Sequence, residues 1–297
     1  FIGRHLLRRL TRFADSRLAI LSRRSISIDH PNAVVVDASL ENLSPATWRQ
    51  AGIDGIDVIF HLGGFIPKSR AEMGQTDPVY RDNVAGTRAL LESLPKAPTR
   101  IVFASTVDVY ATASNGTILN ELSPLGPQSL YAASKLFCEQ AVKFYTDARD
   151  CGYAILRLGH IFGPGEDAYR KLIPETMRQI LRGQSPVIHG TGSALRDFLY
   201  VEDAVEAILR AAISPARAIG PVNIVRGQSV SALQVVETLA RLAGMPEKFE
   251  RLSDKPEGYS LQFDGAAMRA ILGEWPLVSM NEGLAKEFHH QQKRLTA

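Results

Sequence analysis

The chain has 297 residues, of which 45% are hydrophobic and 22% charged, a composition typical of a folded protein with one large domain or two joined ones. The formal net charge of +3 is too small to indicate a nucleic-acid partner, although it suits an anionic small-molecule ligand. No apolar run is long enough to span a membrane, so we expect no membrane contact.

The two cysteines, Cys138 and Cys151, have neither the number nor the spacing of a disulfide framework or a metal site. Free thiols are typical of a reducing compartment, so we expect a cytoplasmic protein without a bound metal.

The chain opens on a helical pattern that has no helix start. In FIGRHLLRRL the apolar residues Ile2, Leu6, Leu7 and Leu10 fall on one helical stripe. No capping residue precedes this stripe and no strand leads into it. The pattern therefore predicts a helix and leaves its beginning unexplained.

Short β-branched runs then alternate with helical patterns. The expected strands are Arg17–Leu21, Ala33–Val36, Val58–Leu62, Arg100–Ser105 and Ala154–Leu158, and the main helices are Asp82–Leu94 and Tyr131–Arg149. Because these strands are continuous apolar runs, both faces of their sheet should be covered. The alternation predicts an α/β fold with a doubly wound parallel sheet.

The pattern changes after Gly163. A loop, GPGEDAYRK, is followed by a less regular mixture of short strands and helices, which predicts a smaller mixed α/β lobe. Its expected elements are the helix Leu172–Leu181, the strand Val222–Val225 and the helices Val230–Ala243 and Ala266–Leu272.

Candidate chemistry begins with Tyr131 and Lys135, which lie one turn apart on one face of a predicted helix. A tyrosine hydroxyl titrates near ~10, and a neighbouring ammonium lowers that pKa toward neutrality. The alternative is a surface tyrosine and lysine on an amphipathic helix. Upstream, Ser105 and Thr106 end a buried strand, where a hydroxyl could polarise a carbonyl beside the tyrosine.

Eight motifs in this order carry a resemblance to a known family: FIGRHLL, VVVDA, DVIFHLGG, NVAGTRALLES, FASTVDVYA, YAASK, ILRLGHIFGPG and RDFLYVEDA. Together they resemble the extended short-chain dehydrogenase/reductases, and within them the nucleotide-sugar epimerase/dehydratase group. The resemblance implies a Rossmann-like dinucleotide-binding domain over residues 1–162 and a substrate lobe over 163–297, partly interleaved with it.

The resemblance also explains the opening of the chain. In this family Phe-Ile-Gly ends a Gly-x-x-Gly-x-x-Gly turn after the first strand, so Gly3 would be the third glycine and would allow close helix–strand packing. We expect Phe1, Ile2 and Gly3 to contact the cofactor. We also expect the natural chain to carry roughly ten further residues before Phe1, including a central strand, by analogy with the length of that turn.

Cofactor preference follows from ILSRRS, which places Ser22, Arg23 and Arg24 where NAD-preferring relatives carry an acid. Arginine pairs with a 2′-phosphate, so we predict NADP, with NAD and two solvated arginines as the alternative. The other cofactor contacts implied by the resemblance are Asp37, Ala38, Leu62, Gly63, Gly64, Asn83, Ser105, Tyr131, Lys135, His160 and Ile161.

The implied mechanism assigns roles to the catalytic candidates. Tyr131 removes a sugar hydroxyl proton during hydride transfer, Lys135 holds the ribose and tunes Tyr131, and Thr106 hydrogen-bonds the same sugar oxygen. The resulting 4-keto sugar is reduced again on its other face or loses water; alternatively, NADPH reduces a keto sugar. Asp108 stands where dehydratases and decarboxylases often carry a Glu. It could have a catalytic role, or it could cap a nearby turn.

The implied substrate contacts lie mainly in the second lobe. Arg196 matches an arginine that grips the substrate diphosphate, with Lys171 and Lys255 as looser matches. His160 replaces the usual Asn that faces the sugar, which leaves the sugar's identity open.

Two other functions remain as alternatives, a non-catalytic dinucleotide-binding sensor and a reductase of small lipophilic carbonyls. The resemblance further implies a homodimer through Asp82–Leu94 and Tyr131–Arg149, with an apolar stripe at Phe137 and Ala141.

Overall fold

The computed structural model describes residues 1–24, 26–166, 171–245, 249–252 and 258–296. The chain forms two compact units, each made of several segments. The first unit comprises Phe1–Ala111, Leu125–Arg157 and Ile208–Val222, and the second comprises Thr112–Pro124, Leu158–Ala207 and Asn223–Ala297.

The sheets of the first unit contain every strand predicted before residue 160. β1 (Leu18–Ser22) pairs in parallel with β2 (Ala33–Asp37), and a four-stranded sheet has the order β10 (Ala218–Ile224), β6 (Gly152–Leu158), β4 (Arg100–Thr106), β3 (Val58–His61). β3 and β4 are parallel. All five predicted strands are confirmed to within two residues, and so is the α/β fold class. Whether a further strand belongs to this sheet in a longer chain stays a prediction.

The helices of the first unit include α1 (Ile2–Leu10), α2 (Pro45–Gln50), α3 (Thr76–Pro78), α4 (Gly86–Ser93) and α5 (Leu130–Ala148), the 3-10 turns η1 (Leu40–Asn42), η2 (Arg70–Glu72) and η4 (Val107–Val109), and the π-helix η3 (Val79–Ala85). α5 matches its prediction to within one residue at each end, because Ser129 Oγ accepts a hydrogen bond from Ala132 N at 3.1 Å and caps the helix. The helix predicted over Asp82–Leu94 instead begins as the π-helix η3 and continues as α4.

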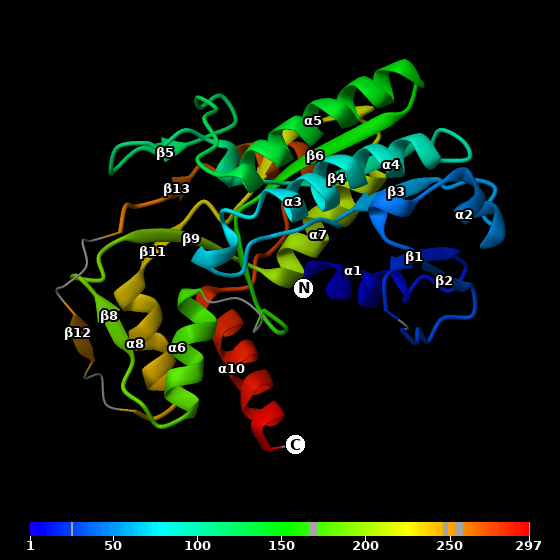
Figure 1. The fold of residues 1–297 in the computed structure, drawn as a ribbon. Helices are drawn as coiled ribbons and strands as arrows, with labels where there is room; N and C mark the ends of the chain where they lie inside the picture. The colour runs from blue at the N-terminus through cyan, green and yellow to red at the C-terminus, as the bar shows by residue number, and fades with distance from the viewer. Residues whose placement is uncertain (25, 167–170, 246–248, 253–257, 297) are drawn as a thin grey trace. The chain divides into compact units, whose positions relative to one another are not determined.

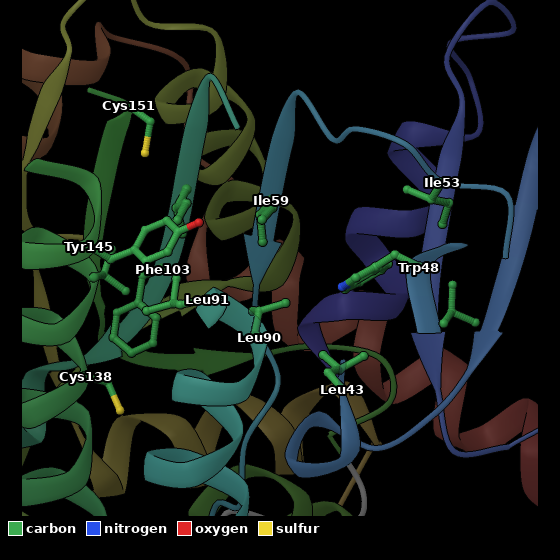
Figure 2. Close-up of a cluster of buried hydrophobic side chains, with 13 residues drawn as sticks. Leu43, Trp48, Ile53, Ile59, Leu90, Leu91, Phe103, Cys138, Tyr145 and Cys151 are labelled. Carbon is green, nitrogen blue, oxygen red and sulfur yellow. The ribbon is translucent and has the colours of Figure 1, made fainter. Parts of the chain in front are cut away.

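The core of the first unit lies between β4 and its covering helices. All seven residues of β4 are buried, as expected for a strand covered on both faces. Figure 2 shows Phe103 of β4 among Leu90 and Leu91 of α4 and Cys138 and Tyr145 of α5. α5 packs on β4 and beside α4 (Figure 1). This packing fixes the position of the first turns of α5, which carry the catalytic candidates.

The described residues of the second unit form short sheets and several helices. The sheets are β11 (Ser229–Ser231), β9 (Leu195–Tyr200), β7 (His160–Phe162) in that order, β12 (Glu250–Leu252) beside β8 (Val187–His189), and β13 (Gln262–Phe263) beside β5 (Ile118–Leu119). The helices are α6 (Leu172–Leu181), α7 (Val201–Ile213), α8 (Ala232–Leu242), α9 (Ala266–Leu272) and α10 (Met280–Thr296), and within α7 the chain passes into the first unit.

The predictions for this part of the chain are met unevenly. α6 and α9 have the predicted bounds. The helix predicted from Val230 starts two residues later, because Val230 pairs with Arg196 in the sheet and Ser231 forms a capping box with Gln234. In the part of the chain that the structure describes, none of the helices combines the length and the apolar character needed to cross a membrane.

Candidate active site

Thr106 ends β4 and lies buried at its carboxyl end. Its Oγ1 accepts a hydrogen bond from Asp108 N at 3.2 Å and so caps the short turn η4. The Asp108 side chain, by contrast, is exposed. The backbone of Asp108 therefore orients the Thr106 hydroxyl, and its carboxylate lies at the surface of η4.

Tyr131 and Lys135 occupy the first two turns of α5, which packs on both β4 and η4. Lys135 is only 6% exposed, and its Nζ lies 4.3 Å from the centroid of the Phe103 ring. Burial lowers the pKa of Lys135 to about 8, although the charge of Glu139 acts in the opposite direction. Thr106, Tyr131 and Lys135, three of the four predicted catalytic residues, thus stand on directly packed elements, and the pKa of the buried Lys135 is close to neutrality.

A chain of hydrogen bonds connects the glycine loop after β3 with the same helix. Asn83 Oδ1 accepts from Phe65 N at 2.7 Å, and Asn83 Nδ2 donates to Ser134 Oγ at 2.9 Å. Ser134 Oγ in turn donates to Tyr131 O at 2.7 Å. Gly64 has φ +152°, and a Cβ there would lie 2.7 Å from Asn83 Oδ1. The loop therefore requires glycine, and it leaves backbone open to a close-lying ligand such as a dinucleotide.

The neighbouring glycine, Gly63, is also closely approached. A Cβ at Gly63 would lie 2.8 Å from Leu40 Cδ1, and one at Gly86 would lie 2.8 Å from Leu40 Cβ. Leu40 of η1 thus fits against two glycines, which holds the segment after β2 against the loop after β3.

His61, the last residue of β3, was not among the predicted site residues. Its ring is buried, and Nε2 lies 2.8 Å from Thr87 Oγ1. Burial, with the charge of Lys135 nearby, lowers the pKa of His61 to about 3, so the ring is neutral at physiological pH. Its place at the end of a predicted strand was a signal that could have singled it out.

The predicted phosphate-binding arginines follow β1. Ser22 Oγ donates to Arg24 O at 2.8 Å and accepts from Arg24 N at 3.2 Å, which shapes the turn. Arg23 has a 67% exposed side chain, and its Nη1 lies 4.0 Å from Asp82 Oδ2. Asp82 is also bound by Arg81 Nε at 2.7 Å. Arg23 therefore lies beside an acid of η3 that sequence reasoning did not connect with it.

Three more of the predicted cofactor contacts, Asp37, Ala38 and Gly3, lie at the end of β2 and in the first turn of α1. Asp37 ends β2 with an exposed side chain, and Ala38 N donates to Val36 O at 3.0 Å. Gly3 is exposed, and a Cβ there would lie at an ordinary 4.0 Å from Leu62 Cδ1. The close helix–strand approach expected at Gly3 concerns the strand predicted to precede Phe1, so it stays a prediction.

Ser105 was predicted as a cofactor contact, but its hydroxyl donates a hydrogen bond within the protein. Ser105 Oγ donates to Glu139 Oε1 at 2.5 Å, and Glu139 forms a buried ion pair with Arg157. Sequence reasoning missed both charged residues, because their ion pair joins a helix to a strand 18 residues further along the chain.

In the second unit, the structure brings together His160 at the start of β7 and Arg196 on β9. His160 pairs in register with Phe198, two residues from Arg196. Burial, followed by the charges of Lys171 and Arg196, lowers the pKa of His160 to about 4. Its buried Nδ1 has no hydrogen-bond partner among the described residues. Three predicted substrate contacts thus share one neighbourhood of this unit.

The Arg196 guanidinium is held by backbone. Its Nη1 donates to Leu195 O at 2.8 Å and to Tyr259 O, and its Cζ lies 5.5 Å from the Tyr259 ring centroid. Burial lowers the pKa of Arg196. These partners of Arg196 among the described residues are neutral, and a guanidinium held in this way suits an anionic ligand. Lys255, the third predicted cation, lies outside the described residues.

Glu166 is a further residue that sequence reasoning missed. It is 2% exposed, and its Oε1 lies 3.3 Å from Lys171 Nζ. Burial raises the pKa of Glu166 to about 7, against the effect of Lys171. A buried carboxyl group therefore adjoins one of the candidate diphosphate-binding lysines.

Residues 1–225 of the chain match the model of the NAD dependent epimerase/dehydratase family. The chain is 30% identical over 275 residues to the UDP-glucose 4-epimerase of Mycolicibacterium smegmatis, covering 89% of this chain and 83% of that protein. It is 25% identical over 279 residues to the dTDP-glucose 4,6-dehydratase of the same organism, with 87% and 83% covered. The structure of MoeE5 in complex with UDP-glucuronic acid and NAD is 26% identical, with a TM-score of 0.85 over 99% of this chain and 96% of that one. This chain therefore belongs to the NAD dependent epimerase/dehydratase family.

Proposed function

We propose that the protein catalyses hydride transfer at a nucleotide sugar through a 4-keto intermediate. The observation that carries this proposal is the placement of Tyr131 and buried Lys135 on a helix packed against the strand that ends in Thr106. The names of the relatives, which are nucleotide-sugar epimerases and dehydratases, support the same class of substrate.

In this proposal each of the three residues has one task. When bound, the nicotinamide accepts the hydride and returns it. The Lys135 ammonium stabilises Tyr131 as a phenolate, and this phenolate takes the proton of the sugar hydroxyl and becomes the neutral phenol. The Thr106 oxygen already accepts from Asp108 N, which leaves its own proton available for the sugar oxygen.

We infer a preference for NADP over NAD. Arg23 and Arg24 follow β1, and an exposed guanidinium suits a 2′-phosphate better than the ribose hydroxyls. The alternative is NAD, which is bound in the MoeE5 structure. Because Asp82 lies beside Arg23, its carboxylate would compete with the 2′-phosphate of NADP for the Arg23 guanidinium.

We propose that the second unit binds the nucleotide diphosphate through Arg196 and Lys171, with Lys255 as a third cation. His160, neutral at physiological pH, would then contact the sugar through hydrogen bonds rather than charge.

Epimerisation or reduction of a keto sugar is favoured over dehydration. Dehydration needs an acid at the neighbouring carbons, and the chain offers Asp108, which is shorter than the usual Glu and exposed on η4. The residue before it, Val107, is buried and brings no second acid.

A screen of UDP-, dTDP- and GDP-sugars tests the proposal directly. We expect at least one of them to reduce protein-bound nicotinamide, seen as new absorbance of the reduced cofactor, and mass spectrometry then identifies the product. The Tyr131→Phe variant is the control. Folded protein that binds nicotinamide and transfers no hydride with any of these sugars would favour a non-catalytic sensor.

We also propose that the protein is a homodimer through η3–α4 and α5. Phe137 and Phe144 of α5 are 58% and 73% exposed, and they lie seven residues apart on one helix face with Ala141 between them. An exposed apolar stripe of this kind is typical of a helix–helix interface.

A further inference from the structure

A fully buried charge network lies in the first unit beside the catalytic candidates. The Glu139 carboxylate is 0% exposed, and Arg157 is 2% exposed. Arg157 donates from Nε to Glu139 Oε1 at 3.0 Å and from Nη2 to Oε2 at 2.8 Å, a two-pronged ion pair. Ser105 Oγ also donates to Oε1 at 2.5 Å, and Arg157 Nη1 donates to Tyr110 OH at 3.1 Å.

Three of the four members of this network adjoin catalytic residues in the chain. Ser105 directly precedes Thr106, and Tyr110 directly follows η4, the turn that Thr106 caps. Glu139 lies one helical turn beyond Lys135 on α5. Arg157 is on β6, the strand next to β4 in the sheet. Glu139 thus joins the helix α5 directly to the end of β4, and Arg157 joins Glu139 to Tyr110 after the turn η4.

A buried ion pair is weak evidence for a stabilising role. Removing two charges from water opposes folding about as strongly as their attraction favours it, and well-packed apolar residues can replace such pairs without loss of stability. What the pair provides, in contrast, is fixed geometry, because each bond has a required distance and direction. The reaction needs such geometry, since Tyr131 and Thr106 act on one sugar oxygen.

The network also affects the protonation of Lys135 through the charge of Glu139. Glu139 is one of the groups that raise the pKa of Lys135 against the larger effect of burial. It therefore helps to keep Lys135 protonated near neutral pH, where the ammonium is needed.

We propose that Glu139 is a positioning residue that acts through Arg157, Ser105 and Tyr110 to hold Thr106, Tyr131 and Lys135 in their reactive arrangement. This inference rests on the proposed hydride transfer and adds to it residues that touch neither cofactor nor sugar.

The decisive variant is the double substitution Glu139→Leu with Arg157→Met, which replaces the ion pair by apolar groups and leaves no unpaired charge. We expect it to fold and to bind the cofactor, since neither changed residue contacts the ligand. We expect its single-turnover hydride transfer to be slower by about 10- to 100-fold, the scale of a small misplacement of reacting groups. We also expect Lys135 to titrate at lower pH, measured by NMR of its labelled side chain with Lys135→Arg assigning the signal.

Arg100→Met is the matched control. Arg100 is a buried arginine at the opposite end of β4, where it donates to Ala211 O and Ser214 O, each at 3.0 Å. This substitution should reduce thermal stability and leave the rate per folded molecule and the Lys135 titration unchanged. Tyr110→Phe removes one oxygen from the network, so it should slow hydride transfer with no change in substrate KM. This single variant tests the inference if the double variant does not fold.

A double variant with the hydride-transfer rate and pH profile of the wild type would overturn the inference. If the double variant does not fold, a Tyr110→Phe variant with the wild-type rate would overturn it instead. If the wild type itself transfers no hydride, the proposed function fails. The inference rests on that function and then fails with it, whereas an active wild type beside an unimpaired double variant overturns the inference alone.

Discussion

Lys135 shows how burial adapts one side chain to a chemical role. A solvated lysine titrates near ~10.4 and would stay charged whatever its neighbours. Under α5 and against Phe103, its pKa falls to about 8, because the ammonium has lost most of its water. At this value Lys135 is still mainly charged at neutral pH, so it can stabilise a phenolate at Tyr131.

Tyr131→Phe should lower hydride transfer by at least ~10²-fold, the usual scale for a general acid or base. Cofactor affinity should change little, because the substitution removes one hydroxyl and keeps the ring. Stopped-flow absorbance of the reduced nicotinamide measures the first effect and calorimetry the second. Turnover close to that of the wild type would show that Tyr131 is not the base.

Arg23→Ala should weaken NADP(H) binding by roughly 1.5–3 kcal/mol, the scale of a charge-assisted hydrogen bond, with little effect on NAD(H). Asp82→Asn should act in the opposite direction, since it removes the carboxylate that competes for Arg23. Arg88→Ala, at an equally exposed arginine of α4 that pairs with Glu92, is the control. Calorimetry in which the wild type prefers NAD(H) would reverse the assignment.

Asp108→Asn separates dehydration from the other net reactions. If the enzyme is a dehydratase, the variant should keep the first hydride transfer and accumulate reduced cofactor, because water leaves only when an acid protonates the departing hydroxyl. If it is an epimerase or reductase, as we favour, overall turnover should stay within about tenfold, well short of the loss that follows removal of a general acid. Stopped-flow absorbance and mass spectrometry for loss of water distinguish the two results.

At the scale of elements, the π-helix η3 and the loop after β3 depend on each other. The π turn places the Asn83 side chain where it binds Phe65 N and O and Ser134 Oγ. π turns within helices are frequent at functional sites, since they redirect a side chain at some cost in stability. Here the redirected amide holds a glycine loop against α5.

Gly64→Ala tests this junction. The new Cβ would lie 2.7 Å from Asn83 Oδ1, at a φ of +152° that a side chain rarely adopts, so we expect a loss of about 1–3 kcal/mol in the free energy of unfolding. Cofactor affinity should fall as well. At Gly52, φ is +68° but a Cβ would meet only Arg17 Nη2 at 3.9 Å, so Gly52→Ala is the milder control. Denaturant unfolding with equal losses at both sites would show that Asn83 does not constrain the loop.

At the scale of the whole molecule, the exposed stripe of α5 predicts the oligomeric state. The double variant Phe137→Lys with Phe144→Lys should be a monomer at micromolar concentration by light scattering, whereas the wild type should be a dimer, because buried charge opposes an apolar interface. Phe13→Lys, at another exposed phenylalanine away from α5, should leave the dimer intact. A monomeric wild type would exclude the predicted interface.

The sequence by itself determined the long elements and the spacing of the candidate catalytic pair. Short runs rich in apolar residues identified β1, β2, β3, β4 and β6, because strands of a sheet covered by helices are mostly apolar. Tyr131 and Lys135 could be placed on one helix face, because four residues make about one helical turn. The motifs around them pointed to the family before any contact was known.

The tertiary structure decided what depends on partners that are distant in the chain. The strands β5 and β13 have two residues each, which is too short for a periodic pattern of apolar residues in the sequence. They form because they pair with each other. The pKa of Lys135 depends on burial under other elements, and the bonds of Glu139 to Arg157 and Ser105 join three separate segments. Local patterns report the periodicity of a segment, whereas desolvation and charge pairing arise only when the segments pack together.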